Sequence, residues 1–189
     1  MAEKTPLDQL EARAQECRAC PLWQTRTNLV FGVGNPQARV LFIGEAPGAD
    51  EDAQGEPFVG RSGQLLNELL ELAGLTREEV YIANILKCRP PGNRNPLPDE
   101  INACTPHLRE QTRTIDPEYI VTVGTFATQF VLKTEERISN LRGQVHQAGR
   151  FKVFPVFHPS YALRNRASVL PVLQDDFRTL GSLLVSGNK

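Results

Sequence analysis

Four short apolar runs, rich in β-branched residues and ended by polar, Gly or Pro residues, constrain the fold of this chain more than any other feature. Near-continuous apolar runs of this kind are typical of strands buried on both faces of a parallel sheet. Helical patterns fill the intervals between them, which is the alternation of an α/β/α sandwich. We therefore predict a three-layer α/β/α fold around a central four-stranded, mainly parallel sheet. The predicted strands are residues 40–44, 80–87, 119–124 and 151–157, and the helical patterns are residues 62–72, 98–114, 125–132 and 170–184.

The chain of 189 residues is long enough for one well-cored domain, and no repeat, low-complexity segment or flexible linker divides it. We predict a single domain over residues 1–189. The first 15 residues are charged and helix-like, and they lack the apolar core of a signal peptide. No apolar run approaches the roughly 20 residues of a membrane-spanning helix. We expect a cytoplasmic protein that does not associate with membranes.

The formal net charge of −1 and the sequence pI of about 6.3 argue against a protein that coats nucleic acid non-specifically. A small basic footprint is still present after two of the predicted strands. Any role in nucleic-acid binding therefore depends on a few phosphate contacts, with a moderate salt dependence. The basic residues concerned are Lys87, Arg89, Arg94, Arg164 and Arg166.

All four cysteines fall into two pairs, Cys17 with Cys20 and Cys88 with Cys104. In a reducing cytosol, paired cysteines are more often metal ligands or redox thiols than structural disulfides. Four thiolates can hold Zn²⁺ or a [4Fe–4S] cluster, and their spacing does not decide between the two. A redox C-x-x-C pair is a third alternative, disfavoured because no β-α-β unit surrounds it.

In a parallel sheet the functional site lies at the carboxyl ends of the strands. The loop from Gly44 to Asp52 contains two glycines and a proline, which let the backbone approach a ligand, although it is equally typical of an acidic surface turn. Phe58 suits either the core or a stacking platform for a planar base. Asn84 lies in a predicted buried strand, where its amide is paired with the backbone or reads a heterocycle. His158, at a strand end before a proline, is either structural or catalytic.

Four motifs in this order, together with the four cysteines, closely resemble the family 4 uracil-DNA glycosylases. They are Gly44-Glu45-Ala46-Pro47-Gly48, Glu56-Pro57-Phe58-Val59-Gly60, Asn84-Ile85-Leu86-Lys87-Cys88-Arg89-Pro90-Pro91 and His158-Pro159-Ser160. The resemblance covers nearly the whole chain. It implies a four-stranded α/β/α fold and a [4Fe–4S] cluster on Cys17, Cys20, Cys88 and Cys104. It also implies excision of uracil from single- or double-stranded DNA by a monofunctional glycosylase that starts base-excision repair and acts as a monomer.

Carried over to this chain, the resemblance implies a uracil pocket. Gly44, Glu45 and Ala46 would line it through the backbone, and Phe58 would stack on the ring. Asn84 would bind the O4/N3 edge, which rejects cytosine because its donor and acceptor pattern is reversed there.

The resemblance also implies roles in catalysis. His158 would donate to O2 of the departing uracil, and a donor aimed there binds the transition state more strongly than the ground state. Glu51 would crowd the C5 position, where thymine carries its methyl group. Another family has an aspartate, credited with positioning water, where this chain has Ala46. Candidates for that task here are Glu45, Glu51 and Asn93.

The target base must leave the duplex before it is hydrolysed, so the resemblance implies a wedge and phosphate contacts. Tyr161 and Leu163 are candidates for the wedge. The predicted DNA-binding residues are Lys87, Arg89, Arg94, Tyr161, Leu163 and Arg164. Two other hypotheses stay open: a non-catalytic nucleic-acid-binding module of the same fold, and a zinc-stabilised redox or nucleotide-binding α/β protein.

Overall fold

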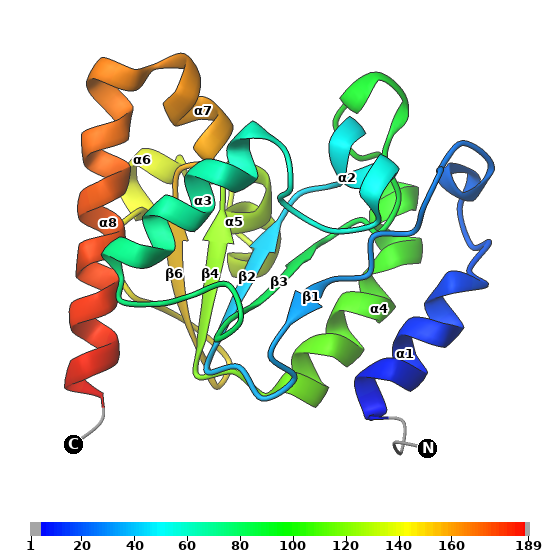
Figure 1. Ribbon diagram of the computed structural model, residues 1–189, viewed down its shortest axis with the longest axis horizontal. Helices are drawn as coiled ribbons and strands as arrows, with labels where there is room; N and C mark the ends of the chain where they lie inside the picture. The colour runs from blue at the N-terminus through cyan, green and yellow to red at the C-terminus, as the bar shows by residue number, and fades with distance from the viewer. Residues whose placement is uncertain (1–4, 188–189) are drawn as a thin grey trace.

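The computed structural model describes residues 5–187, whose core is a six-stranded sheet of order β1-β3-β2-β4-β6-β5 (Figure 1). The four inner strands are parallel, and the two edge strands are antiparallel to their neighbours. The strands are β1 (Val33–Gly34), β2 (Val40–Gly44), β3 (Tyr81–Asn84), β4 (Tyr119–Val123), β5 (His146–Ala148) and β6 (Phe151–Val156).

The predicted α/β fold with a mainly parallel sheet is confirmed, whereas the predicted number of four strands was wrong. All four predicted apolar runs are the inner parallel strands. The missed strands β1 and β5 have only two and three residues and are not buried, so no apolar run marks them. Part of the predicted N-terminal segment, residues 1–4, lies outside the described residues, as do residues 188–189.

The helices follow the predicted alternation with the strands. The α-helices are α1 (Pro6–Gln15), α2 (Ala49–Gln54), α3 (Arg61–Leu72), α4 (Pro98–Ile115), α5 (Thr125–Leu132), α6 (Ile138–Leu141), α7 (Pro159–Arg164) and α8 (Arg166–Ser186). Two short 3₁₀ helices are η1 (Pro21–Gln24) and η2 (Pro91–Asn93). No helix within residues 5–187 combines the length and the apolarity that crossing a membrane requires.

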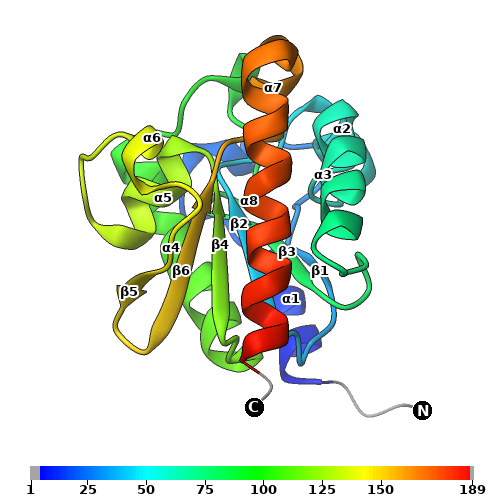
Figure 2. The same cartoon turned by 90° about the vertical axis from the view of Figure 1, so that its left-hand side faces the viewer.

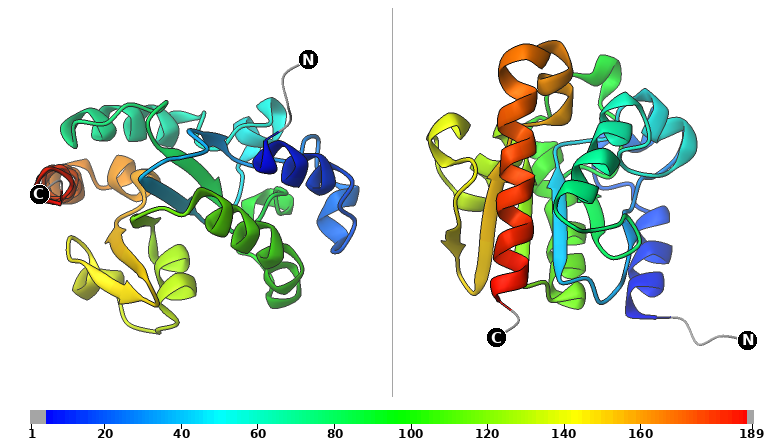
Figure 3. Two further views of the ribbon diagram at one scale, coloured as in Figure 1. Left: turned by 90° about the horizontal axis from the view of Figure 1, so that it is seen from below. Right: turned by 60° about the vertical axis from the view of Figure 1, so that its left-hand side comes forward.

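The sheet separates two hydrophobic cores because successive strand residues point to opposite faces. Phe42 packs under α3 and α8 and stacks on Phe177 with ring centroids 6.1 Å apart. Its neighbours Leu41 and Ile43 face the layer of α1, α4 and α5. Figures 2 and 3 show α3 and α8 on one side of the sheet and α4 and α5 on the other. These two layers make the sandwich.

Helix α4 places one cysteine beneath the carboxyl edge of the sheet. Its buried positions Cys104, Leu108, Gln111 and Ile115 recur at helical spacing, so this stripe packs inward. Glu100 caps the first turn by accepting the N–H of Leu97 at 2.8 Å. Helix α1 packs against α4 through the same core, which brings the N-terminal cysteine segment towards Cys104.

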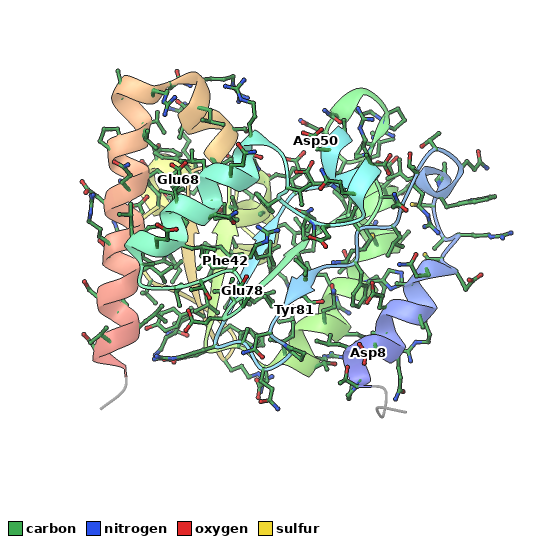
Figure 4. All side chains as sticks on the ribbon, viewed as in Figure 1. Asp8, Phe42, Asp50, Glu68, Glu78 and Tyr81 are labelled. Atoms are coloured by element: carbon green, nitrogen blue, oxygen red, sulfur yellow. The ribbon has the colours of Figure 1, made fainter. Side chains whose placement is uncertain are left out.

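All parallel strands end at one edge of the sheet, and α2 and α7 lie at that edge (Figure 1). Figure 4 labels Phe42 within the sheet and Asp50 on α2 at this upper end. The loops that leave the strands here carry the residues of the predicted site.

Candidate functional site

A pocket of about 480 Å³ opens at the carboxyl ends of β2 and β3. Its walls come from segments that are far apart in the sequence, because parallel strands deliver their loops to one edge. The lining includes nine residues that the sequence predicted for the site: Glu45, Ala46, Glu51, Phe58, Asn84, Asn93, His158, and the predicted DNA-binding residues Arg94 and Arg164.

Gly44 is not part of the pocket lining, but it makes room for two side chains that are. A Cβ atom added to Gly44 would lie 2.4 Å from Oδ1 of Asn84 and 2.8 Å from two ring carbons of Phe58. These separations are shorter than real Cβ contacts, so only glycine allows the amide and the ring to meet here.

Asn84 ends β3 and is only 2% exposed, yet its Oδ1 has no hydrogen-bond partner within residues 5–187. A buried acceptor without a partner costs about 1–3 kcal/mol. Its backbone carbonyl is satisfied by the ammonium of Lys87 at 2.9 Å. The unpaired acceptor therefore belongs to the side chain that lines the pocket, where a ligand N–H would satisfy it.

Phe58 is buried in the left-handed backbone region, with φ of 52°. A side chain that is not glycine rarely adopts this conformation, so the surrounding loop must enforce it. Gly63 allows α3 to lie against this loop, because a Cβ there would clash with the Phe58 carbonyl. The ring stacks beside His158, with centroids 5.7 Å apart and planes inclined by 27°.

Glu51 ties together the two loops that carry these groups. Its Oε2 accepts the N–H of Gly48 at 3.1 Å, and its Oε1 accepts those of Val59 and Gly60 at 3.1 and 3.2 Å. The carboxylate thus fixes the loop after β2 against the Phe58 loop. The contact of Glu51 with a substrate stays a prediction. Its three hydrogen bonds between the two loops, the Glu51 clamp, were not anticipated from the sequence.

His158 follows β6, and its tautomer is set by Ser160. The backbone N–H of Ser160 donates to Nδ1 at 3.1 Å, and the Ser160 hydroxyl lies 2.8 Å from the same nitrogen. Because a backbone N–H can only donate, Nδ1 is the acceptor and the ring proton of the neutral form is on Nε2. Burial, together with the positive charge of Arg164, lowers the pKa of His158 to about 4.

Glu45 is half-buried between this pocket and its neighbour, and it carries a carboxylate for which no hydrogen-bond partner is found among the described residues. Burial raises the pKa of Glu45. Ala46 beside it has no side-chain donor or acceptor. Asn93 adopts a positive φ of 55° and accepts the Arg89 Nε–H at 2.7 Å, as expected of a turn residue.

Only some of the predicted basic residues are free to contact DNA. Lys87 is 0% exposed, which contradicts its predicted contact with DNA. Its ammonium group turns inward because the Asn84 carbonyl and the Phe31 ring lie beside it. Arg94 is engaged by both oxygens of Glu100. Arg164 is exposed and lines the pocket.

A second hollow of about 790 Å³ adjoins the first over β4 and β6. The two share Glu45, His158 and Arg164 in their linings. Tyr161, 42% exposed, lines the second hollow and lies against Phe157, with ring centroids 5.6 Å apart. Leu163 packs against the core, so it is less available as a wedge than Tyr161.

The four cysteines lie around one small pocket below the loop that follows β3. Burial raises the pKa of Cys88, and it raises that of Cys104 to about 11. The Lys87 backbone N–H donates to Cys104 Sγ at 3.2 Å, and Arg26 donates to Cys88 Sγ at 3.3 Å. Within residues 5–187, no three His, Cys, Asp or Glu side chains are close enough to hold a single metal ion.

Sequence reasoning missed three contributors to these sites. Ser160 orients His158, and the short His-Pro-Ser spacing was its only signal. Arg26 reaches the cysteines from a segment whose sequence has no marker. The role of Glu51 depends on three backbone donors that no side-chain pattern reveals.

Known proteins of similar sequence identify the family of this chain. The family model for the Uracil DNA glycosylase superfamily matches residues 31–179. A type-4 uracil-DNA glycosylase of Archaeoglobus fulgidus is 44% identical over 185 residues, which cover 94% of this chain and 92% of that protein. One from Thermotoga maritima is 48% identical over 167 residues, covering 86% and 87%. A type-5 enzyme of Pyrobaculum aerophilum is 31% identical, covering 82% and 71%. The chain therefore belongs to the uracil DNA glycosylase superfamily, and within it to the type-4 uracil-DNA glycosylases.

Proposed function

We propose that this protein excises uracil from DNA by hydrolysing its N-glycosidic bond. The observation that carries this proposal is the unpaired, buried Oδ1 of Asn84 in a pocket that also holds a neutral histidine. Uracil N3–H is a donor that satisfies this acceptor, and the amide N–H₂ can donate to O4. Cytosine presents an acceptor at N3 and a donor at C4, so the same amide orientation rejects it.

The ring of the bound base lies against Phe58 in this proposal. An aromatic platform held in a strained conformation is pre-organised, so little entropy is lost when the base stacks on it. Gly44 leaves the space that the Asn84 amide and the Phe58 ring occupy beside its backbone. Glu51 accepts three backbone hydrogen bonds and so keeps the Phe58 platform in place, and this positioning is its role in the proposed site.

His158 assists departure of the base by donating its Nε2–H to uracil O2. Cleavage places negative charge on uracil and positive charge on the sugar, so the bond to O2 strengthens in the transition state. A neutral donor suffices, because the lowered pKa leaves the ring uncharged at neutral pH. One pre-organised donor of this kind typically contributes about 10²–10³ in rate.

The water that attacks the sugar needs an acceptor, and we assign this role to Glu45. Its carboxylate is half-buried at the junction of the two hollows, beside the His158 wall. A raised pKa makes it a stronger base than an exposed glutamate. Asn93 is less suited, because its side chain already holds Arg89.

The base must be flipped out of the stack, which costs a few kcal/mol and least in single strands or mismatches. Exposed Tyr161 is the better placed wedge candidate, and Arg164 is the better placed phosphate ligand. We also propose that the protein acts as a monomer. We include residues 1–189 in a single glycosylase domain.

We also propose a [4Fe–4S] cluster on Cys17, Cys20, Cys88 and Cys104. All four thiols line one pocket, and four cysteine thiolates are the usual ligand set of a [4Fe–4S] cluster. Such a cluster would tie the segment after α1 to the loop after β3. Hydrolysis transfers no electrons, so its role here is structural.

The test is release of uracil from a uracil-containing oligonucleotide, detected as alkaline cleavage at the abasic site. We expect alkaline cleavage at positions of uracil and not at positions of cytosine. His158→Ala should lower the single-turnover rate by about 10²–10³, with an unchanged circular dichroism spectrum. A folded wild-type protein that binds the oligonucleotide without releasing uracil would indicate the alternative, a non-catalytic module.

A further inference from the structure

Arg26 is the one arginine whose guanidinium contacts both cysteine-bearing segments in the described part of the chain. Its Nη1 donates to Cys88 Sγ at 3.3 Å and to the Cys17 carbonyl at 3.2 Å. Its Nη2 donates to the Gln15 carbonyl, at the end of α1, at 2.7 Å. The side chain is half-buried and forms part of the pocket wall that the four cysteines share.

This arrangement joins segments that the sequence keeps far apart. Cys88 stands 62 positions after Arg26, in the loop after β3, whereas Cys17 precedes Arg26 by nine. A forked guanidinium can hold several acceptors at fixed angles, which a lysine ammonium cannot reproduce. Arg26 therefore bridges the segment of the first cysteine pair and Cys88 of the second.

The charge of Arg26 acts on the sulfur itself. Four thiolates gathered in a partly buried pocket repel one another, and a cation beside them offsets part of that negative charge. An N–H···S bond also withdraws electron density from the sulfur. Hydrogen bonds to the sulfurs and net charge are among the factors that set the reduction potential of iron–sulfur clusters.

We propose that Arg26 is a cofactor-binding residue, a cationic donor to the Cys88 sulfur that retains the cluster and raises its reduction potential. This inference rests on the proposed [4Fe–4S] cofactor and adds to it a residue that is not a metal ligand. Outer partners of metal ligands typically change metal affinity by about 10–100-fold when removed.

Arg26 also has a simpler role that the experiment must separate. By donating to the Gln15 carbonyl it completes the C-terminal turn of α1, as basic residues at helix ends commonly do. Such a cap would order the N-terminal segment without altering the electronic state of the cofactor. The reduction potential distinguishes the two roles, because a cap alone leaves it unchanged.

The experiment compares the purified wild-type protein with Arg26→Gln, Arg26→Lys and Arg18→Gln. Arg18 is the matched control: its guanidinium lies 4.9 Å from the ring centroid of Trp23, which lines the same pocket, and it donates to no sulfur among the described contacts. Iron per chain, the rate of loss of visible absorbance in an iron chelator, and the reduction potential are measured. Circular dichroism checks folding.

We expect Arg26→Gln to lose its cluster about tenfold faster than the wild type and to have a lower reduction potential. Arg26→Lys keeps the positive charge but lacks the forked guanidinium, so its rate of cluster loss and its reduction potential should lie between those of Arg26→Gln and the wild type. If Arg26→Gln does not fold, Arg26→Lys serves as the test variant. Arg18→Gln should match the wild type. Faster loss with an unchanged potential, or no change in either, would overturn the proposal. A wild-type protein that holds no iron would overturn the cofactor as well.

Discussion

The base of the uracil pocket should tolerate no side chain at Gly44, so Gly44→Ala is the sharpest perturbation of its shape. The backbone at Gly44 is not in the left-handed region, so alanine adds no backbone strain there. Its single methyl group would lie 2.4 Å from Asn84 Oδ1 and 2.8 Å from the Phe58 ring. The substitution therefore acts on the two groups that we propose hold the base.

The size of the effect follows from these distances. Ordinary contacts of a Cβ begin at 3.4 Å, so Oδ1 must retreat by roughly 1 Å and the ring by roughly 0.6 Å. A displacement of about 1 Å in a reacting geometry costs on the order of 100-fold in rate. We expect the single-turnover rate of uracil release to fall by about 100-fold.

The assay is single-turnover release of uracil from a U·G duplex by wild type, Gly44→Ala and Gly74→Ala. Gly74 is the control, because its φ of 69° makes alanine strained while nothing lies within 4 Å. Gly74→Ala should lose about 1 kcal/mol of stability and keep its activity. A folded Gly44→Ala protein with a rate close to that of the wild type would refute the assignment of this pocket.

Three further predictions concern neighbouring groups. In a Glu45→Gln background, which removes the carboxylate proposed to activate water, uracil release should persist as the pH falls through 6.5 and decline only towards about 4. The pKa of His158 is lowered to about 4, and protonation of Nδ1 would break the bond from the Ser160 N–H that orients the ring; a break near 6.5 in the pH–rate profile would contradict this. Glu51→Gln should lower the free energy of unfolding by about 1–3 kcal/mol in urea, since an amide leaves a backbone N–H unpaired, and unchanged stability would argue against the clamp. Arg164→Gln should reduce the slope of the logarithm of the DNA-binding constant against the logarithm of the salt concentration by about 1. Arg178→Gln on α8, where Arg178 pairs with Asp175, is the control and should leave the slope unchanged. Equal slopes for the two variants would contradict a contact between Arg164 and DNA.

The inner sheet could be predicted because strands that are buried on both faces require continuous apolar runs in the sequence. Strand β2 was predicted with its observed bounds, and so was helix α5. The edge strands β1 and β5 could not be predicted in this way. They are short, and their pairing with β3 and β6 depends on backbone hydrogen bonds rather than on side-chain pattern.

The candidate site also contains residues that the sequence could predict and residues that it could not. Asn84 and His158 could be singled out because polar residues at strand ends are conspicuous in an apolar context. Lys87 was assigned wrongly to DNA because its position after the strand resembles a surface loop, while its long side chain folds back beneath the Asn84 carbonyl. Arg26 was missed because its partners are two backbone carbonyls and a sulfur from distant segments.

The central claim is that the unpaired Asn84 amide reads uracil, and its most direct test is the single-turnover rate of uracil release by Asn84→Ala from a U·G duplex. Removing a buried hydrogen-bonding partner costs about 1–3 kcal/mol, so we expect the rate to fall by about 5- to 150-fold while the fold is kept. A folded Asn84→Ala protein that releases uracil within about twofold of the wild-type rate would contradict the claim, because the rate loss expected from the amide would be absent.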